Sequence, residues 1–222
     1  MIPTILLTRR DRDCGYDELH LAAKMGNSDA IEHYLKAGHC VNIQDKNGQT
    51  PLHYASSYMQ LDVIMILAEN GANINAMSNS GVTPLHCVAS KKISGIIVYL
   101  LKKGAKVNVK NRLGVTPLHK ACASGDTGII KILCKQGAII KAIDNNGQTP
   151  LHYSVTNGHL EAVKILLHLK AEIDVEDNHE KTPLSISLDK GHVEIEKYLV
   201  EKGANSLGKK YLAYSWVYPH RF

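Results

Sequence analysis

The hydrophobic and polar positions of the chain fall into short apolar stretches with helical spacing, separated by polar stretches rich in turn-forming residues. Val63, Ile64 and Leu67 follow the spacing that places apolar side chains on one face of a helix. The polar stretch that comes after them, including residues 78–81, is rich in Ser, Asn and Gly, which favour turns. The pattern therefore predicts a helix at about 61–69 followed by a hairpin-like loop.

The same order of polar and apolar residues returns along the chain, and the phrase Thr-Pro-Leu-His marks each return. Intact copies begin at Thr50, Thr83, Thr116 and Thr149, each 33 residues after the last. The same step leads to two altered copies, Asp-Glu-Leu-His at 17–20 and Thr-Pro-Leu-Ser at 182–185. A fixed step of this size indicates an array of stacked units, here over roughly residues 12–209.

Each copy of the phrase carries the signals of a helix start. The hydroxyl of Thr50 can cap the first unpaired backbone amides, and Pro51 has no amide to leave unpaired and a preset φ. A second helix then ends at a glycine such as Gly71, which readily adopts the left-handed conformation of a helix stop. One helix pair of this size cannot bury its apolar face alone, so the units are expected to stack on their neighbours.

The period, the Thr-Pro-Leu-His phrase and closing phrases such as Gly104-Ala105-Lys106-Val107-Asn108 resemble the ankyrin repeat. The resemblance implies an all-α solenoid of stacked helix-turn-helix units with β-hairpin-like loops. It divides the chain into an N-terminal extension (1–11), six repeats (about 12–44, 45–77, 78–110, 111–143, 144–176 and 177–209) and an aromatic C-terminal tail (210–222).

In the ankyrin family, loop tips and the ends of the first helices line a concave groove where partner proteins bind, and the resemblance implies the same role for these positions here. We predict that exposed apolar, aromatic and basic side chains form such a partner-binding groove, centred on Leu113 and matched by an acidic rim on the partner. An alternative is that the loop-tip Val and Leu side chains pack on the next loop. The predicted partner-binding residues are Tyr58, Met77, Val82, Lys91, Lys110, Arg112, Leu113 and Val115.

The resemblance implies a protein-protein interaction module or adaptor. An alternative is a host-directed ankyrin effector of an intracellular bacterium or a large virus, which the abundance of Lys, Ile and Asn over Arg favours slightly. A further possibility implied by the family is hydroxylation of Asn42, Asn75 or Asn108. The sequence does not identify the partner, and a monomer is expected.

Other kinds of chemistry find little support in the sequence. The net charge of +5 is not gathered into a basic stripe interleaved with aromatic residues, so no nucleic-acid partner is expected. The phosphate-loop, dinucleotide-binding, metalloprotease and nucleophile-elbow patterns do not occur, so we predict neither an enzyme nor a cofactor. No apolar stretch approaches the roughly 18 residues of a membrane span.

The histidines and cysteines are also expected to be structural. In the family, the imidazole of the repeated phrase hydrogen-bonds loop backbone, and His20, His53, His86, His119 and His152 match that position. The five cysteines match no zinc arrangement, so no metal is expected. Unpaired cysteines indicate a reducing compartment, for which we predict the cytoplasm, with the nucleus or delivery into a host cell left open.

Several positions depart from the repeated pattern. Met59 and Lys92 stand where most units have a glycine between their two helices, which predicts backbone strain and a locally soft third unit. Glu180 and Ser185 replace the turn glycine and the histidine of the last unit, which suits an end cap. The aromatic tail is predicted to fold as a helix at 211–217 over the end of the array, with docking of a second protein as the alternative.

Overall fold

The computed structural model describes residues 18–91 and 93–205, which form twelve α-helices and no strand. The predicted all-α architecture is therefore confirmed over this part of the chain. The chain divides into two compact units, unit 1 ending at Arg112 and unit 2 beginning at Leu113. The N-terminal extension, Lys92 and the expected tail helix at 211–217 lie outside the described residues.

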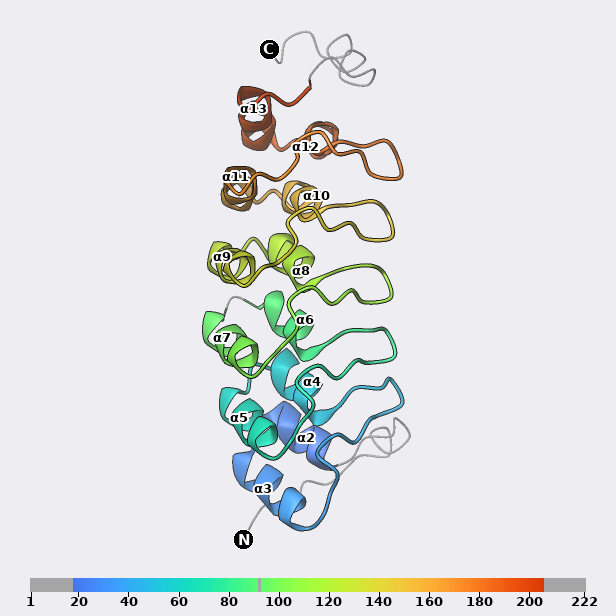
Figure 1. The fold of residues 1–222 in the computed structure, drawn as a ribbon, viewed down its shortest axis with the longest axis vertical. Helices are drawn as coiled ribbons and strands as arrows, with labels where there is room; N and C mark the ends of the chain where they lie inside the picture. The colour runs from blue at the N-terminus through green and yellow to red at the C-terminus, as the bar shows by residue number, and fades with distance from the viewer. Residues whose placement is uncertain (1–17, 92, 206–222) are drawn as a thin grey trace. The chain divides into compact units, whose positions relative to one another are not determined.

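Unit 1 is built from three helix pairs, each with a first and a second helix. In Figure 1 the first helices form one layer and the second helices another, while the loops between pairs project away from the first-helix layer. The first helices are α2 (Glu18–Met25), α4 (Pro51–Ser57) and α6 (Pro84–Ala89), and the second helices are α3 (Ser28–Lys36), α5 (Leu61–Glu69) and α7 (Ser94–Lys102).

Unit 2 repeats this arrangement, with its loops projecting from the first-helix layer in the same way (Figure 1). Its first helices are α8 (Pro117–Ser124), α10 (Pro150–Thr156) and α12 (Pro183–Lys190), and its second helices are α9 (Thr127–Lys135), α11 (Leu160–His168) and α13 (Val193–Glu201). The second helix predicted at about 61–69 matches α5.

The core of each unit comes from apolar side chains on facing helices. Leu52 and Ala55 of α4 and Ile64 and Leu67 of α5 are completely buried. Each large aliphatic side chain removed from water contributes roughly 1.5–3 kcal/mol. Stacking of successive pairs therefore supplies the stability that one pair lacks.

The predicted caps are present at the start of the first helices. In α4, Thr50 and His53 form a capping box, and Pro51 occupies the first helical turn. The Thr50 N–H donates to Nδ1 of His53 (3.1 Å), and Nε2 of His53 donates to the carbonyl of Val82 (2.9 Å) in the next loop. The same bridge runs from His20 to Gln49, from His119 to Gln148 and from His152 to Lys181. These histidines therefore tie each helix start to the neighbouring loop, as predicted.

The backbone at the junctions also follows the predicted glycine pattern, with substitutions at a few places. Gly71, at the end of α5, has a φ of 83°. Met59 and Glu180 adopt the same left-handed region, with φ of 64° and 56°. Lys170 does so as well (φ 66°), at a helix-ending position where the repeat 33 residues earlier has Gly137. Among these three described positions, the substitution at Lys170 is the one that was not predicted.

Candidate interaction surface

The ends of the first helices in unit 1 present one row of exposed side chains. Met25, the last residue of α2, is 61% exposed, and Tyr58, at the end of α4, is 49% exposed. α2 packs against α4 and α4 against α6, whose end is followed by the exposed Lys91. The Lys24 ammonium lies 5.3 Å from the centre of the Tyr58 ring, a cation–π arrangement. The row thus combines a thioether, an aromatic ring and basic groups.

The helix ends are held in place by backbone contacts. Gln60 Nε2 donates to the carbonyl of Lys24 at 3.3 Å, which satisfies an acceptor at the end of α2. Gly26 follows α2 with a φ of 74°, and a side chain there would collide with Gln60. The exposed residues of this row therefore sit on a fixed support.

The loop tips of unit 1 form a second row, and hydrogen bonds join each tip to the next. The Asn79 N–H donates to the carbonyl of Asn47 (2.8 Å), and the Arg112 N–H donates to the carbonyl of Ser80 (2.9 Å). Asn79 Nδ2 also donates to the carbonyl of Lys46 (2.9 Å). These bonds fix the tips, so little ordering is needed when another molecule binds them.

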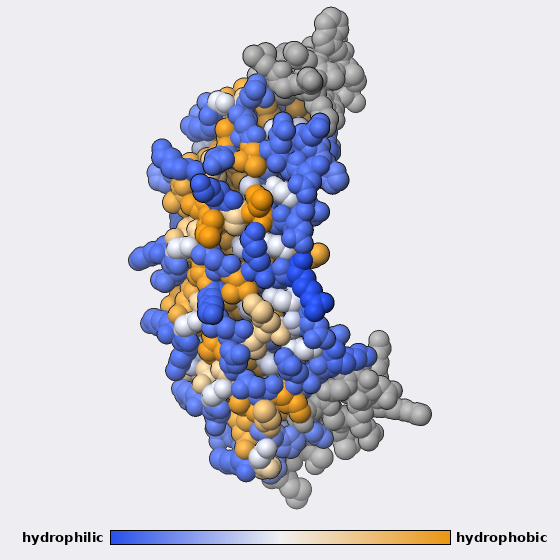
Figure 2. All heavy atoms as spheres, turned by 45° about the vertical axis from the view of Figure 1, so that its right-hand side comes forward, coloured by the Kyte–Doolittle hydropathy of each residue, from blue (hydrophilic) through white to orange (hydrophobic). Residues whose placement is uncertain are grey.

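The residues predicted for this second row differ in how far they reach solvent. Met77, Lys110 and Arg112 are exposed. Val82 is half-buried, and its carbonyl accepts hydrogen bonds from His53 and from the Ser78 N–H. In Figure 2 the loop tips along the right-hand edge are mostly hydrophilic, with hydrophobic residues gathered beside them.

In unit 2 the two loop residues predicted for this surface differ in exposure. The Leu113 side chain is 66% exposed, while its carbonyl accepts a hydrogen bond from the Asn145 N–H at 2.9 Å. Val115 is only 4% exposed, so its expected place in an exposed groove is wrong. Val115 directly precedes the capping Thr116, which is itself buried, so its side chain turns into the packed base of the loop.

Two exposed apolar residues in the loop between α9 and α10 were missed in the sequence. Ile143 and Ile139 are both about half exposed. Ile143 stands 66 residues, or two repeat steps, after Met77 and could have been found by aligning the repeats at that position. Ile139 lies in the closing phrase, where the repeats carry no comparable signal.

The titratable groups near the loops that have shifted pKa values take part in structural hydrogen bonds. Burial lowers the pKa of His53 and His152, although their backbone hydrogen bonds and nearby carboxylates oppose this shift. Tyr153 donates to Oδ2 of Asp144 (2.8 Å), and burial together with that carboxylate raises the pKa of the phenol. These groups stay in one protonation state near neutral pH, which suits fixed hydrogen bonds.

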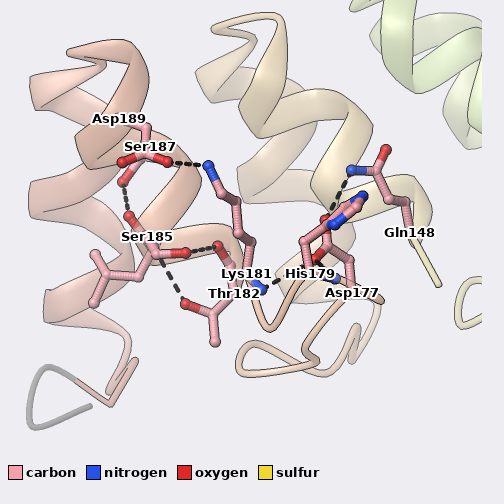
Figure 3. Close-up of polar contacts among 9 residues, drawn as sticks. Gln148, Asp177, His179, Lys181, Thr182, Ser185, Ser187 and Asp189 are labelled. Carbon is pink, nitrogen blue, oxygen red and sulfur yellow. Dashed lines mark hydrogen bonds and ion pairs between the residues drawn. The ribbon is translucent and has the colours of Figure 1, made fainter. Parts of the chain in front are cut away.

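Polar contacts hold the loop that precedes α12 (Figure 3). Oδ1 of Asp177 accepts hydrogen bonds from the N–H groups of His179 and Lys181, and its Oδ2 accepts one from Gln148 Nε2 (3.0 Å). Burial raises the pKa of Asp177, but these hydrogen bonds outweigh it and leave that pKa below its ordinary value. Figure 3 also shows the ion pair between Lys181 and Asp189.

Ser185 stands where the preceding pairs have the bridging histidine. Its hydroxyl donates to the carbonyl of Thr182 at 2.9 Å, within its own helix start. Its hydroxyl therefore satisfies an acceptor within its own helix start.

Among the described residues there is neither a cluster of metal ligands nor a helix that could span a membrane. No group of three His, Cys, Asp or Glu side chains within 18–91 and 93–205 is placed to hold a metal ion. Over the same part of the chain, every helix is too short or too polar to cross a bilayer.

Comparison with known proteins finds a family whose repeats match this chain. A family model described as ankyrin repeats (3 copies) matches the chain over residues 19–111 and again over 93–177. No curated protein matches the chain.

Proposed function

The chain belongs to the ankyrin-repeat family, and we propose that it is a protein-binding module or adaptor that recognises its partner through loop tips and first-helix ends. Ankyrin repeats generally mediate protein-protein interactions. Catalysis is not part of the proposal, because members of the family are typically non-enzymatic.

One observation carries the proposal: exposed apolar side chains stand on a backbone that is already fixed. Leu113 combines a 66% exposed side chain with a carbonyl held by the Asn145 N–H at 2.9 Å. A large exposed aliphatic group on a rigid support loses little conformational entropy on binding and can act as an anchor. Tyr58 and Met77 offer comparable anchors in unit 1.

The exposed charges among the proposed residues favour an acidic partner surface. Lys91, Lys110 and Arg112 are exposed and carry positive charge. Basic groups at the rim of an interface speed association and select partners with complementary potential. The proposed partner-binding residues are Tyr58, Met77, Val82, Lys91, Lys110, Arg112 and Leu113.

We place the protein in the cytoplasm as a monomer. Cys40, Cys122 and Cys134 carry free thiols, which is typical of a reducing compartment. The same surface would also serve a host-directed effector, and the identity of the captured partner would distinguish the two functions.

The test is capture of partners from an extract of the native cells. Immobilised wild-type protein should retain a partner that the double variant Arg112→Ala with Leu113→Ala fails to retain, with both proteins melting at the same temperature. Val200→Ala on the second helix α13 is the matched control, because it removes an exposed aliphatic group from another face. Equal capture by the double variant and the wild type would contradict the proposed centre.

A further inference from the structure

A hollow of about 700 Å³ lies among the second helices of unit 2, apart from the loop tips and first-helix ends discussed above. Residues of α9 and α11 line it, together with Tyr198 of α13. Ile140, Ile165 and Leu169 give it apolar walls. A recess of this size can hold an apolar side chain of another molecule.

The small side chain of Cys134 leaves room for this hollow. It stands where the repeats before and after it have Leu101 and Leu167, so a thiol replaces a larger isobutyl group. Burial raises the pKa of Cys134 to about 11, which keeps the thiol neutral near pH 7. A neutral cysteine behaves as a small apolar residue, so Cys134 adds to the apolar part of the lining.

The rim of the hollow is basic. Lys131, Lys135 and Lys164 line it, and none of its described lining residues is a carboxylate. Lys164 pairs with Glu161 (2.7 Å) and lies 5.8 Å from the Tyr198 ring, so it helps to shape one wall. The exposed Lys131 and Lys135 supply positive charge on α9, which has no acidic residue.

The fold does not require these lysines. At corresponding positions of unit 1, Glu32 stands for Lys131 and Glu69 for Lys135. The second-helix face therefore accepts either sign of charge, and the basic character belongs to this part of the chain. A neighbouring hollow of about 500 Å³ contains Glu172 and is less suited to an acidic ligand.

We propose that this hollow is a second docking site, which binds an acidic peptide segment of another protein. An aliphatic or aromatic side chain of the segment enters the recess over Cys134, and its carboxylates face Lys131 and Lys135. Charge complementarity selects the acidic segment. A peptide fits better than an anionic membrane, because a recess of about 700 Å³ accepts a single protruding side chain more readily than the flat surface of a bilayer.

The probe is an array of short peptides in which the number of acidic residues and the identity of one apolar residue vary. The tightest peptides are then measured in solution by fluorescence anisotropy with the full chain. Binding should require both acidic residues and the apolar residue, and it should weaken as salt is raised.

Two variants test the contacts. Lys131→Glu with Lys135→Glu should weaken peptide binding about tenfold or more, since two attractive pairs become repulsive. Cys134→Leu should weaken binding to a similar degree by filling the recess, while Cys134→Ala, which leaves it open, should bind as wild type does. Lys190→Glu is the charge control, because Lys190 is exposed on α12 and does not line the hollow.

Circular dichroism and thermal unfolding establish that each variant is folded, and Glu32 and Leu101 indicate that unit 2 can accept these side chains. The proposal is overturned if no peptide binds, if binding survives Cys134→Leu in a folded protein, or if Lys190→Glu weakens it equally. It is also overturned if vesicles of phosphatidylserine bind in a Lys131-dependent manner and the peptides do not. The variants at Arg112 and Leu113 should leave peptide binding unchanged, which separates this site from the proposed partner surface.

Discussion

The imidazole of His159 occupies the space into which a side chain at Gly125 would project. A Cβ added to Gly125 would lie 2.5 Å from Cγ of His159, and Nε2 of His159 donates to the carbonyl of Ala123 at 3.0 Å. Gly125 also has a φ of 70°, in the left-handed region. The junction between α8 and α9 therefore needs glycine for its backbone angle and for the close approach of the next helix pair.

Gly125→Ala should destabilise the protein by about 2 kcal/mol or more, because it adds a steric clash to the cost of a left-handed residue. Gly137→Ala is the matched variant, since Gly137 has a φ of 84° but no atom within 4 Å of the added Cβ. It should cost only about 1 kcal/mol. Urea unfolding measures both, and equal losses would show that the approach of His159 has no energetic consequence.

Met59→Gly should leave the protein equally stable or stabilise it by up to about 1 kcal/mol, because Met59 has a φ of 64°. Relief of left-handed strain is partly offset by the greater freedom of glycine in the unfolded chain. Met65→Gly is the control within α5, where glycine should destabilise by about 1 kcal/mol. A clear loss of stability from Met59→Gly would contradict the proposed strain.

Hydrogen exchange should locate the soft part of the chain. We expect amides of α6 and α7 to exchange faster than those of α10 and α11. In the sequence Lys92 stands between α6 and α7, at the position where Gly158, with a φ of 72°, lies between α10 and α11. Mass spectrometry of peptic fragments gives the comparison. Slower exchange in α6 and α7 would remove the support for a soft region there.

His119→Ala should destabilise the protein by about 2–3 kcal/mol. It removes the contacts of the imidazole with Thr116 (2.8 Å) and with the carbonyl of Gln148 (3.0 Å), and leaves their partners buried. Ser185→Ala at the matching position should cost less than about 1 kcal/mol, since its hydroxyl bonds only within its own helix start. Similar losses in chemical denaturation would argue against the bridging role.

Stability should fall as the pH is lowered below about 6.5, the ordinary pKa of histidine. Burial lowers the pKa of His53 and His152, so the unfolded chain takes up protons that the folded chain does not. Each of them contributes a slope of up to about 1.4 kcal/mol per pH unit between 6.5 and its lowered pKa. Asp177 changes the free energy of unfolding only at lower pH, because its pKa lies below 3.8 in the folded protein.

Denaturation between about pH 7 and pH 5 checks this dependence. The variant His53→Gln should be less stable than wild type at neutral pH and should lose less stability as the pH falls. An unchanged slope would mean that His53 does not titrate as the buried environment implies.

The sequence by itself determined the helix pairs and their caps, and the resemblance to the ankyrin family implied the bridging histidines. The helix starts and ends depend on local rules: a threonine followed by proline, as at Thr50 and Pro51, starts a helix in each described copy, and a glycine such as Gly71 follows the end of one. The local signals recur every 33 residues, so a copy with altered residues can be recognised from its spacing to the intact copies.

Only the tertiary structure decided which variable side chains reach solvent and where the surface is hollow. Leu113 and Val115 are both aliphatic loop residues, yet one is 66% and the other 4% exposed, because exposure depends on how the loop base packs. The hollow over Cys134 likewise needs two helices and the position of Tyr198, which are brought together by stacking. Burial is a property of neighbours in space, and the repeat pattern describes neighbours in sequence.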